Sequence, residues 1–196
     1  MGLKYAVITS VTRDDLPDGG ASIFNETIKA VKKSNPGIKI EILIPDFSGD
    51  IQPLETVLRA EPDVLNHNLE VPETLYSRIN RPSKNYRRSL QVLKRAKDRG
   101  AVTKSGLMLG LGESEEDILR TIMDLREVSC DLLTIGQYLQ AVKNNAPVVK
   151  YYSPDRFDLF REKALHAGFK AVVSGPLVRS SYLAHKLYNN INNLEV

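Results

Sequence analysis

The stretch SGLMLGLGESEED, residues 105–117, decides the fold, because it holds the end of a strand, a glycine-rich turn and the start of a helix. Its first residues are apolar on both faces, which is typical of a strand buried in a parallel sheet. Ser114 then begins a helical pattern, and its spacing to Asp117 is that of a capping box. The stretch therefore predicts a strand–turn–helix unit.

The same unit recurs along the chain. Short β-rich runs alternate with helical patterns, which predicts right-handed βαβ units and a parallel sheet. The predicted strands are residues 5–9, 38–44, 63–65, 102–109, 132–135 and 170–173. The predicted helices are residues 22–33 and 86–99, the helix that Ser114 begins, and one that Ser153 and Pro154 begin and Gly168 ends.

The composition is ordinary for a soluble globular protein. The 196 residues are 42% hydrophobic and 26% charged, with a net charge of +3, and we expect one domain, 1–196, with its own core. No long basic run indicates nucleic acid, and no apolar run has the length of a membrane span. The first residues do not form a signal or transit peptide, so we expect a cytoplasmic location, or an organellar one if an upstream segment is missing.

Cysteine and histidine are scarce. Cys130 is the single cysteine, so it cannot form an intrachain disulfide or hold an iron–sulfur cluster alone. The three histidines are His67, His166 and His185. No second histidine or cysteine lies at ligand spacing, which argues against a zinc site.

Polar clusters follow the predicted strands at their carboxyl ends. In a barrel or part-barrel these ends share one rim, where active sites lie. No G-x-G-x-x-G motif opens the first helix, which argues against a dinucleotide site on an open doubly wound sheet. The clusters are TSVTRDD (9–15), NHN (66–68), GLGE (110–113), GQY (136–138) and SGPLVRSSY (174–182).

Each cluster also has a structural interpretation. Glu113 can complete a tight turn before a helix N-terminus. His67 can be a base or a ligand, but a buried structural role is the simpler one. Ser180 or Ser181 can cap the helix that follows; no G-x-S-x-G motif is present and His185 lies one helical turn away, which argues against a hydrolase.

Taken together, these segments resemble the lipoyl synthase family of radical S-adenosylmethionine (SAM) enzymes, from about Gly2 to Ala184. The order of these segments, their spacing and their residues all agree with that family. The stretches that carry the resemblance are YAVITSVTRDDLPDGGA, VLNHNLE, YRRSLQVLKRAK, TKSGLMLGLGE, LTIGQYLQ, PVVKY and GPLVRSSY.

The resemblance implies a partial (β/α)6 barrel and a transferase of lipoate biosynthesis. In that reaction two sulfur atoms are inserted at C6 and C8 of an octanoyl chain carried on a lysine of a lipoyl domain or of the glycine-cleavage H protein. The implied cofactors are SAM and two [4Fe-4S] clusters, one of which cleaves SAM to a 5′-deoxyadenosyl radical while the auxiliary one donates sulfur. A ferredoxin or flavodoxin is the implied reductant, and neither nucleic acid nor membrane is implied as a partner.

The resemblance also implies roles for particular residues. The amino end of SAM is expected near Thr9, Ser10 and Asp14, and its ribose near Asn66 and Asn68. Glu113, with Gly110 and the rest of the 106–112 strand, is expected to support the adenosine pocket. Gln137 and Tyr138 are expected to line the adenine or the acyl chain.

The RSSY segment is expected to serve the auxiliary cluster. The resemblance implies that one serine ligates its unique iron, and we favour Ser181 over Ser180. Arg179 is the expected electrostatic neighbour. A serine oxygen is a weak iron ligand beside thiolates, which suits a cluster that gives up its sulfur.

The sequence departs from the family in two places. The family's two cysteine triplets, Cys-x3-Cys-x2-Cys and Cys-x4-Cys-x5-Cys, are absent from these 196 residues, and Cys130 matches a buried structural position. Ala141, Val142 and Lys143 stand where the family usually has Pro-Ser-Arg. We therefore expect MGLKY to be the interior of a longer sequence, with Met1 in a helix that Gly2 ends, and the first βα unit to be missing.

Three functional hypotheses remain open. The chain can be an incomplete lipoyl synthase that is inactive alone. It can be one subunit of a two-chain enzyme whose partner supplies the cysteines. It can also be a non-catalytic remnant that binds lipoyl domains or SAM.

Overall fold

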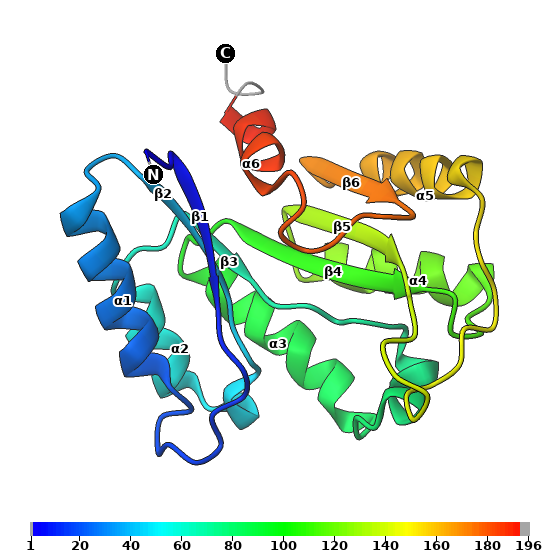
Figure 1. Ribbon diagram of the computed structural model, residues 1–196, viewed down its shortest axis with the longest axis horizontal. Coiled ribbons are helices and arrows are strands. Elements are labelled where there is room, and N and C mark those ends of the chain that lie inside the picture. Colours follow the sequence, from blue (N-terminus) through cyan, green and yellow to red (C-terminus); the bar gives the residue numbers. More distant parts are fainter. Residues whose placement is uncertain (1, 193–196) are drawn as a thin grey trace.

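Six parallel strands form one curved sheet in the computed structural model, which describes residues 2–192 (Figure 1). The strands follow one another across the sheet in chain order, and within the described residues the first does not pair with the sixth. The predicted open barrel of (β/α) units is therefore confirmed. The strands are β1 Tyr5–Thr9, β2 Lys39–Leu43, β3 Val64–Asn66, β4 Thr103–Leu109, β5 Leu132–Gln137 and β6 Ala171–Gly175.

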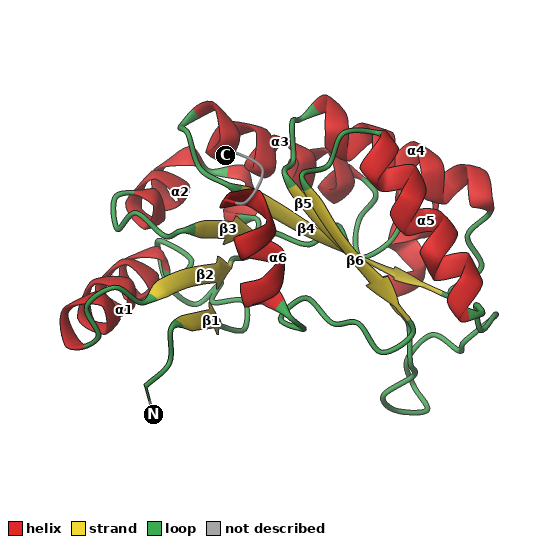
Figure 2. Cartoon of the chain, turned by 90° about the horizontal axis from the view of Figure 1, so that it is seen from above, coloured by secondary structure: helices red, strands yellow, loops and turns green. Residues whose placement is uncertain are grey.

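The helices that follow the first five strands cover the outer side of this sheet (Figure 2). Their apolar faces pack against the strands and form two large clusters of buried side chains, one under β1–β3 and one under β4–β6. The helices are α1 Ala21–Ser34, α2 Ile51–Leu58, α3 Lys84–Asp98, α4 Glu115–Glu127, α5 Pro154–His166 and α6 Ala184–Asn192, with 3-10 turns at Phe47–Gly49 and Glu73–Ile79. None of the helices in residues 2–192 is both long and apolar enough to cross a bilayer.

The local signals in the sequence are largely confirmed. Every predicted strand is present, with ends shifted by at most two residues. Ser114 and Asp117 form the predicted capping box, with the Ser114 hydroxyl accepting from the Asp117 N–H at 3.1 Å and the Asp117 carboxylate accepting from the Ser114 N–H at 3.0 Å. Gly168 ends α5 with a φ of +100°. The short helix α2 was not predicted.

The last helix closes the amino ends of the strands. Leu187 of α6 packs with Val64, Leu132 and Ala171, which lie at the beginnings of β3, β5 and β6. The chain reaches α6 from β6 through residues 176–183, which we call the crossing segment (Figure 1). Met1, which was expected to lie in a helix, is outside the described residues.

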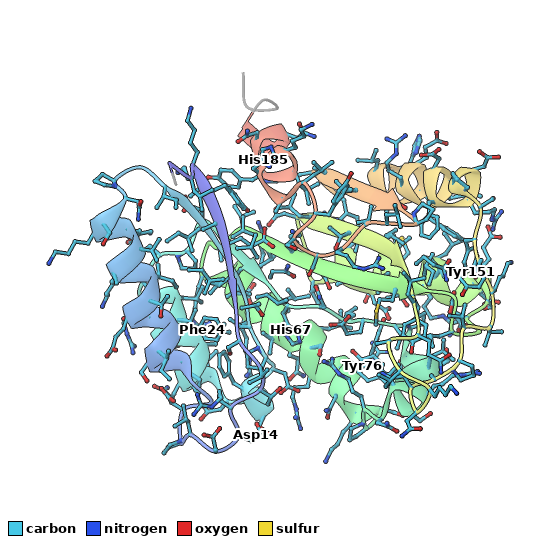
Figure 3. All side chains as sticks on the ribbon, viewed as in Figure 1. Asp14, Phe24, His67, Tyr76, Tyr151 and His185 are labelled. Carbon is cyan, nitrogen blue, oxygen red and sulfur yellow. The ribbon has the colours of Figure 1, made fainter. Side chains whose placement is uncertain are left out.

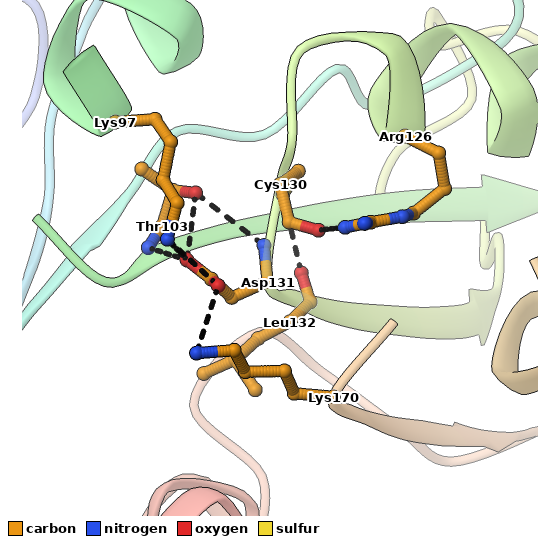
Figure 4. A network of polar contacts seen from close by, with 7 residues as sticks. All are labelled: Lys97, Thr103, Arg126, Cys130, Asp131, Leu132 and Lys170. Carbon is orange, nitrogen blue, oxygen red and sulfur yellow. Dashed lines mark hydrogen bonds and ion pairs between the residues drawn. The ribbon is translucent and has the colours of Figure 1, made fainter. Parts of the chain in front are cut away.

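A polar network anchors the amino ends of β4 and β5 to α3 (Figure 4). The buried Asp131 carboxylate accepts from the Thr103 N–H at 2.9 Å and pairs with Lys97 at 2.7 Å and Lys170 at 3.4 Å. Cys130 beside it is fully buried, and this burial raises the pKa of its thiol to about 12. The structural position expected for Cys130 is confirmed.

We predict that Asp131→Ala lowers the free energy of unfolding by about 3 kcal/mol, because the change leaves a buried N–H and two ammonium groups without their acceptor. Urea denaturation measures this. Asp98→Ala is the matched control, since it removes the exposed ion pair with Lys94, and should change stability by less than about 1 kcal/mol. Equal effects of the two variants would contradict the role given to Asp131.

Candidate functional site

Two adjoining cavities lie at the carboxyl ends of the strands. Asn68 and Glu70 line both of them. We call them the inner cavity, about 200 Å³, and the outer cavity, about 350 Å³. The inner cavity lies over β4 and β5 and is lined by Gly106, Thr134, Gly136, Gln137, Tyr138 and Arg179, among others. The outer cavity lies over β1–β3 and is lined by Thr9, Ser10, Asp14, His67, Asn85 and Arg88, among others.

The structure brings three of the predicted SAM contacts together at the outer cavity. Thr9 ends β1, Ser10 and Asp14 follow it, and all three line the outer cavity. Figure 3 shows Asp14 and His67 toward the carboxyl ends of the strands, with His185 near the opposite ends. The predicted gathering of polar groups at one edge of the sheet is therefore confirmed for these residues, while their ligand contacts stay predictions.

Asn68 has a buried acceptor between the two cavities. Its Oδ1 atom is shielded from solvent and has no hydrogen-bond partner among the described residues. The amide lies against Gly106, where a Cβ would come within 2.8 Å of Oδ1, so only glycine leaves it in place. Asn85 Oδ1, at the outer cavity, is likewise shielded from solvent and has no hydrogen-bond partner among the described residues. An unpaired buried acceptor is costly. Asn66 Oδ1 is unpaired as well, but only Asn68 and Asn85 line a cavity, where a ligand can donate hydrogen bonds to them.

Glu70 lies two residues after Asn68 and lines both cavities, although the sequence pattern does not single it out as a site residue. Its backbone has a φ of +72°, which is unusual for a residue other than glycine. The strained turn is held by main-chain bonds from Glu70 N–H to the Gly106 carbonyl and from Met108 N–H to the Glu70 carbonyl, at 3.0 and 2.6 Å. Burial raises the pKa of the Glu70 carboxyl, and nearby Arg81 opposes this.

His67 has the structural role that was the simpler interpretation. Its Nδ1–H donates to the Ile44 carbonyl at 2.9 Å, and its Nε2 accepts from the Ser89 hydroxyl at 2.8 Å. Burial lowers the pKa of the imidazole, so the neutral ring is favoured. His67 thus ties the end of β2 to α3 and forms part of the wall of the outer cavity.

Glu113 closes the turn that follows β4. Its carboxylate accepts from the Gly110 N–H at 2.6 Å and the Leu111 N–H at 2.9 Å. A side chain at Gly110 would come within 2.2 Å of the Gln137 amide nitrogen and 2.6 Å of the Lys150 carbonyl. Neither residue lines the inner or the outer cavity, although both were expected at the adenosine pocket. Their contacts are those of the tight-turn interpretation.

Gln137 and Tyr138 hold the long loop that follows β5. Gln137 Nε2 donates to the Lys150 carbonyl at 3.0 Å, and its Oε1 accepts from the Tyr152 N–H at 3.0 Å. The Tyr138 hydroxyl donates to the Ala146 carbonyl at 2.9 Å. Both residues line the inner cavity while their polar groups bind the loop.

Asn66 lies apart from the cavities, although it was expected beside Asn68 at the ribose. It is fully buried, is not among the residues lining either described cavity, and donates from Nδ2 to Glu41 Oε1 at 2.9 Å. The reason is geometric. β3 ends at Asn66, so Asn66 still lies within the sheet, whereas Asn68 lies two residues further on and reaches the carboxyl edge of the sheet.

The crossing segment divides the predicted RSSY residues between two places. Arg179 and Ser180 line the inner cavity, whereas Ser181 lines a separate depression of about 780 Å³ between β1 and α6. The segment lies close on β5, because a Cβ at Gly136 would come within 2.2 Å of the Val178 carbonyl oxygen.

Residues 1–125 match the family model described as the radical SAM superfamily. Among solved structures, methylornithine synthase superposes with a TM-score of 0.64 at 15% identity, over 99% of this chain and 67% of that one. The hydroxymethylglutaryl-CoA lyase of Brucella melitensis gives 0.56 at 14% identity, over 87% of this chain and 58% of that one. These structures share the fold, and the chain belongs to the radical SAM superfamily.

Several relatives that are at least half identical to this chain are lipoyl synthases. That of Rubrobacter xylanophilus is 54% identical over 95% of this chain and 58% of its own length. That of Caldicellulosiruptor bescii is 52% identical over 99% of this chain and 67% of its own length. Within the superfamily, the chain belongs to the lipoyl synthase family, and it spans about three fifths of the length of the curated relatives it matches.

We predict that Glu70→Gln stabilises the chain at high pH but not at low pH. Because the folded-state pKa of Glu70 is raised, ionisation favours the unfolded chain, and the wild type loses stability relative to the variant as pH rises through that pKa. Near pH 4 both side chains are neutral and the two urea midpoints should converge.

Glu26→Gln on the exposed side of α1 is the control, and it should stay within about 0.5 kcal/mol of wild type throughout. A difference for Glu70→Gln that is constant with pH, or that grows toward acid, would refute the account of this carboxyl.

Proposed function

We propose that this chain provides the part of a lipoyl synthase that binds SAM and the octanoyl substrate. The proposed reaction is insertion of sulfur at C6 and C8 of an octanoyl group carried on a protein lysine, as in the enzyme family to which the chain belongs. The observation that carries the proposal is the unpaired, buried Asn68 Oδ1 at the junction of the two cavities. It lies at the carboxyl edge of an open barrel, where active sites of such folds lie.

The residues at this edge fit SAM. Its ribose hydroxyls would donate to Asn68 Oδ1, which needs donors. The α-ammonium end would lie in the outer cavity near Thr9, Ser10 and Asp14, whose side chains supply oxygen acceptors. When bound, SAM supplies the hydrogen-abstracting group of the reaction, and this chain's residues hold and orient it.

The inner cavity is the proposed place for the octanoyl chain. It is narrow and carries apolar groups from Leu107, Met108 and Leu139 beside the polar ones. An octanoylated lipoyl domain or H protein is the proposed partner, and a ferredoxin or flavodoxin the proposed reductant.

The 196 residues by themselves do not fit a four-iron cluster. Their one thiol, Cys130, is buried, and the residues that the structure describes contain no group of three metal-binding side chains. Ser181 is the proposed oxygen ligand of the auxiliary cluster, with thiolates supplied from elsewhere. The alternatives are a cysteine-bearing partner subunit and a non-catalytic protein that binds lipoyl domains or SAM.

We predict that the 196-residue chain binds S-adenosylhomocysteine in isothermal titration calorimetry, since the proposed contacts of the ribose come from its own residues. Asn68→Ala should weaken binding about tenfold, which corresponds to about 1.4 kcal/mol for one lost buried hydrogen bond.

Asn190→Ala on the exposed side of α6 is the matched control and should bind like wild type. Absence of binding by the wild type, or equal binding by Asn68→Ala, would refute the proposed cofactor site.

We also predict that anaerobic reconstitution with iron and sulfide gives this chain no stable four-iron absorption band, because usually three or four cysteine ligands are needed. A stable band on the isolated chain would overturn this. Co-purification from the native source separates the alternatives: a partner with six cysteines supports the two-chain enzyme, and a lone chain counts against it.

A further inference from the structure

A buried ion pair lies on the inner side of the sheet. Lys104 Nζ on β4 is 2.8 Å from Glu41 Oε1 on β2, and their side chains are 0% and 1% exposed. The same carboxylate accepts from the Tyr5 hydroxyl at 2.8 Å and from Asn66 Nδ2 at 2.9 Å. Because apolar side chains of similar volume often stabilise a core as well as a buried ion pair does, stability alone does not explain Lys104.

Lys104 has a second partner, which an apolar side chain could not hold. Its Nζ donates to the main-chain carbonyl of Ser180 at 2.6 Å, across 76 positions of sequence. This contact lies in the middle of the crossing segment. The neighbouring segment bonds are local turns, from Val178 N–H to the Gly175 carbonyl and from Tyr182 N–H to the Arg179 carbonyl.

The position of the Ser180 carbonyl decides which side chains face which space. Arg179 and Ser180 line the inner cavity, and Ser181 lines the depression between β1 and α6. A shift of the segment by one residue would place Ser181 at the position of Ser180, which lines the inner cavity. A fixed carbonyl between Arg179 and Ser181 therefore determines both orientations.

We propose that Lys104, held by Glu41, is a positioning residue that fixes the crossing segment and so directs Arg179 into the inner cavity and Ser181 away from it. Lys104 lines neither the inner cavity, nor the outer cavity, nor the depression between β1 and α6. It therefore acts through the main chain of Ser180. The proposal rests on the proposed function only for what Arg179 and Ser181 do once they are placed.

Hydrogen–deuterium exchange of the 196-residue chain, read by mass spectrometry, tests this. Lys104→Met removes the donor but keeps the length of the side chain. We expect the amides of residues 177–183 to exchange at least tenfold faster, while amides in the centre of β4 and β5 exchange as in wild type. The readout needs no cofactor and no activity, so its failure is distinguishable from failure of the proposed function.

Lys104→Met leaves the buried Glu41 carboxylate without its partner, and the variant could fail to fold for that reason. A second variant keeps the test decisive in that case. Lys104→Met with Glu41→Gln removes both charges, and the amide keeps an oxygen that accepts from Asn66 Nδ2 and a nitrogen that donates to the Tyr5 hydroxyl. We expect this double variant to fold and still to show the tenfold faster exchange at 177–183.

Lys97→Met is the matched control, because it removes a similar ammonium from a buried carboxylate, Asp131, at the amino ends of the strands. It should lower the melting temperature without a selective change at 177–183. Exchange at 177–183 that stays at the wild-type rate in the double variant, or that rises equally in Lys97→Met, would overturn the proposal.

Discussion

One carboxylate, that of Glu41, joins four strands of the sheet to the segment that crosses it. It accepts from Tyr5 on β1, Asn66 on β3 and Lys104 on β4, and Lys104 in turn holds the carbonyl of Ser180. Burial lowers the pKa of Lys104, and the Coulombic attraction of Glu41 opposes this, so the pair depends on close contact. The open sheet lacks the closure that fixes a full barrel, and this network supplies a fixed inner side.

The carboxyl edge depends on close approaches that this inner side permits. Gly106 lets the Asn68 amide lie against β4, and Gly136 lets the crossing segment lie against β5. The two cavities meet at Asn68 and Glu70. Asn68 has an unpaired acceptor, and Glu70 has a carboxyl with a raised pKa and a backbone with a positive φ. Strain and unpaired groups of this kind are usually found where a protein holds a ligand.

Local structure could be read from the sequence, but side-chain neighbours across the sheet could not. Apolar runs fixed the six strands within two residues, and the Ser114 capping box was read directly, because both signals are local. The short helix α2 was missed, since eight residues give little periodicity. Asn66 was expected at the edge, yet its partner Glu41 lies 25 positions away. A larger separation in sequence, 76 positions, hid the contact of Lys104 with Ser180.

The central claim is that the carboxyl edge of this sheet holds the nucleoside of SAM between β3, β4 and β5. A crystal structure of the 196-residue chain grown with S-adenosylhomocysteine tests it most directly. The account predicts ribose hydroxyls within hydrogen-bond distance of Asn68 Oδ1, with the amino acid part toward Thr9 and Asp14. A nucleoside bound elsewhere on the chain, or an Asn68 amide that stays unpaired beside a bound nucleoside, would contradict it.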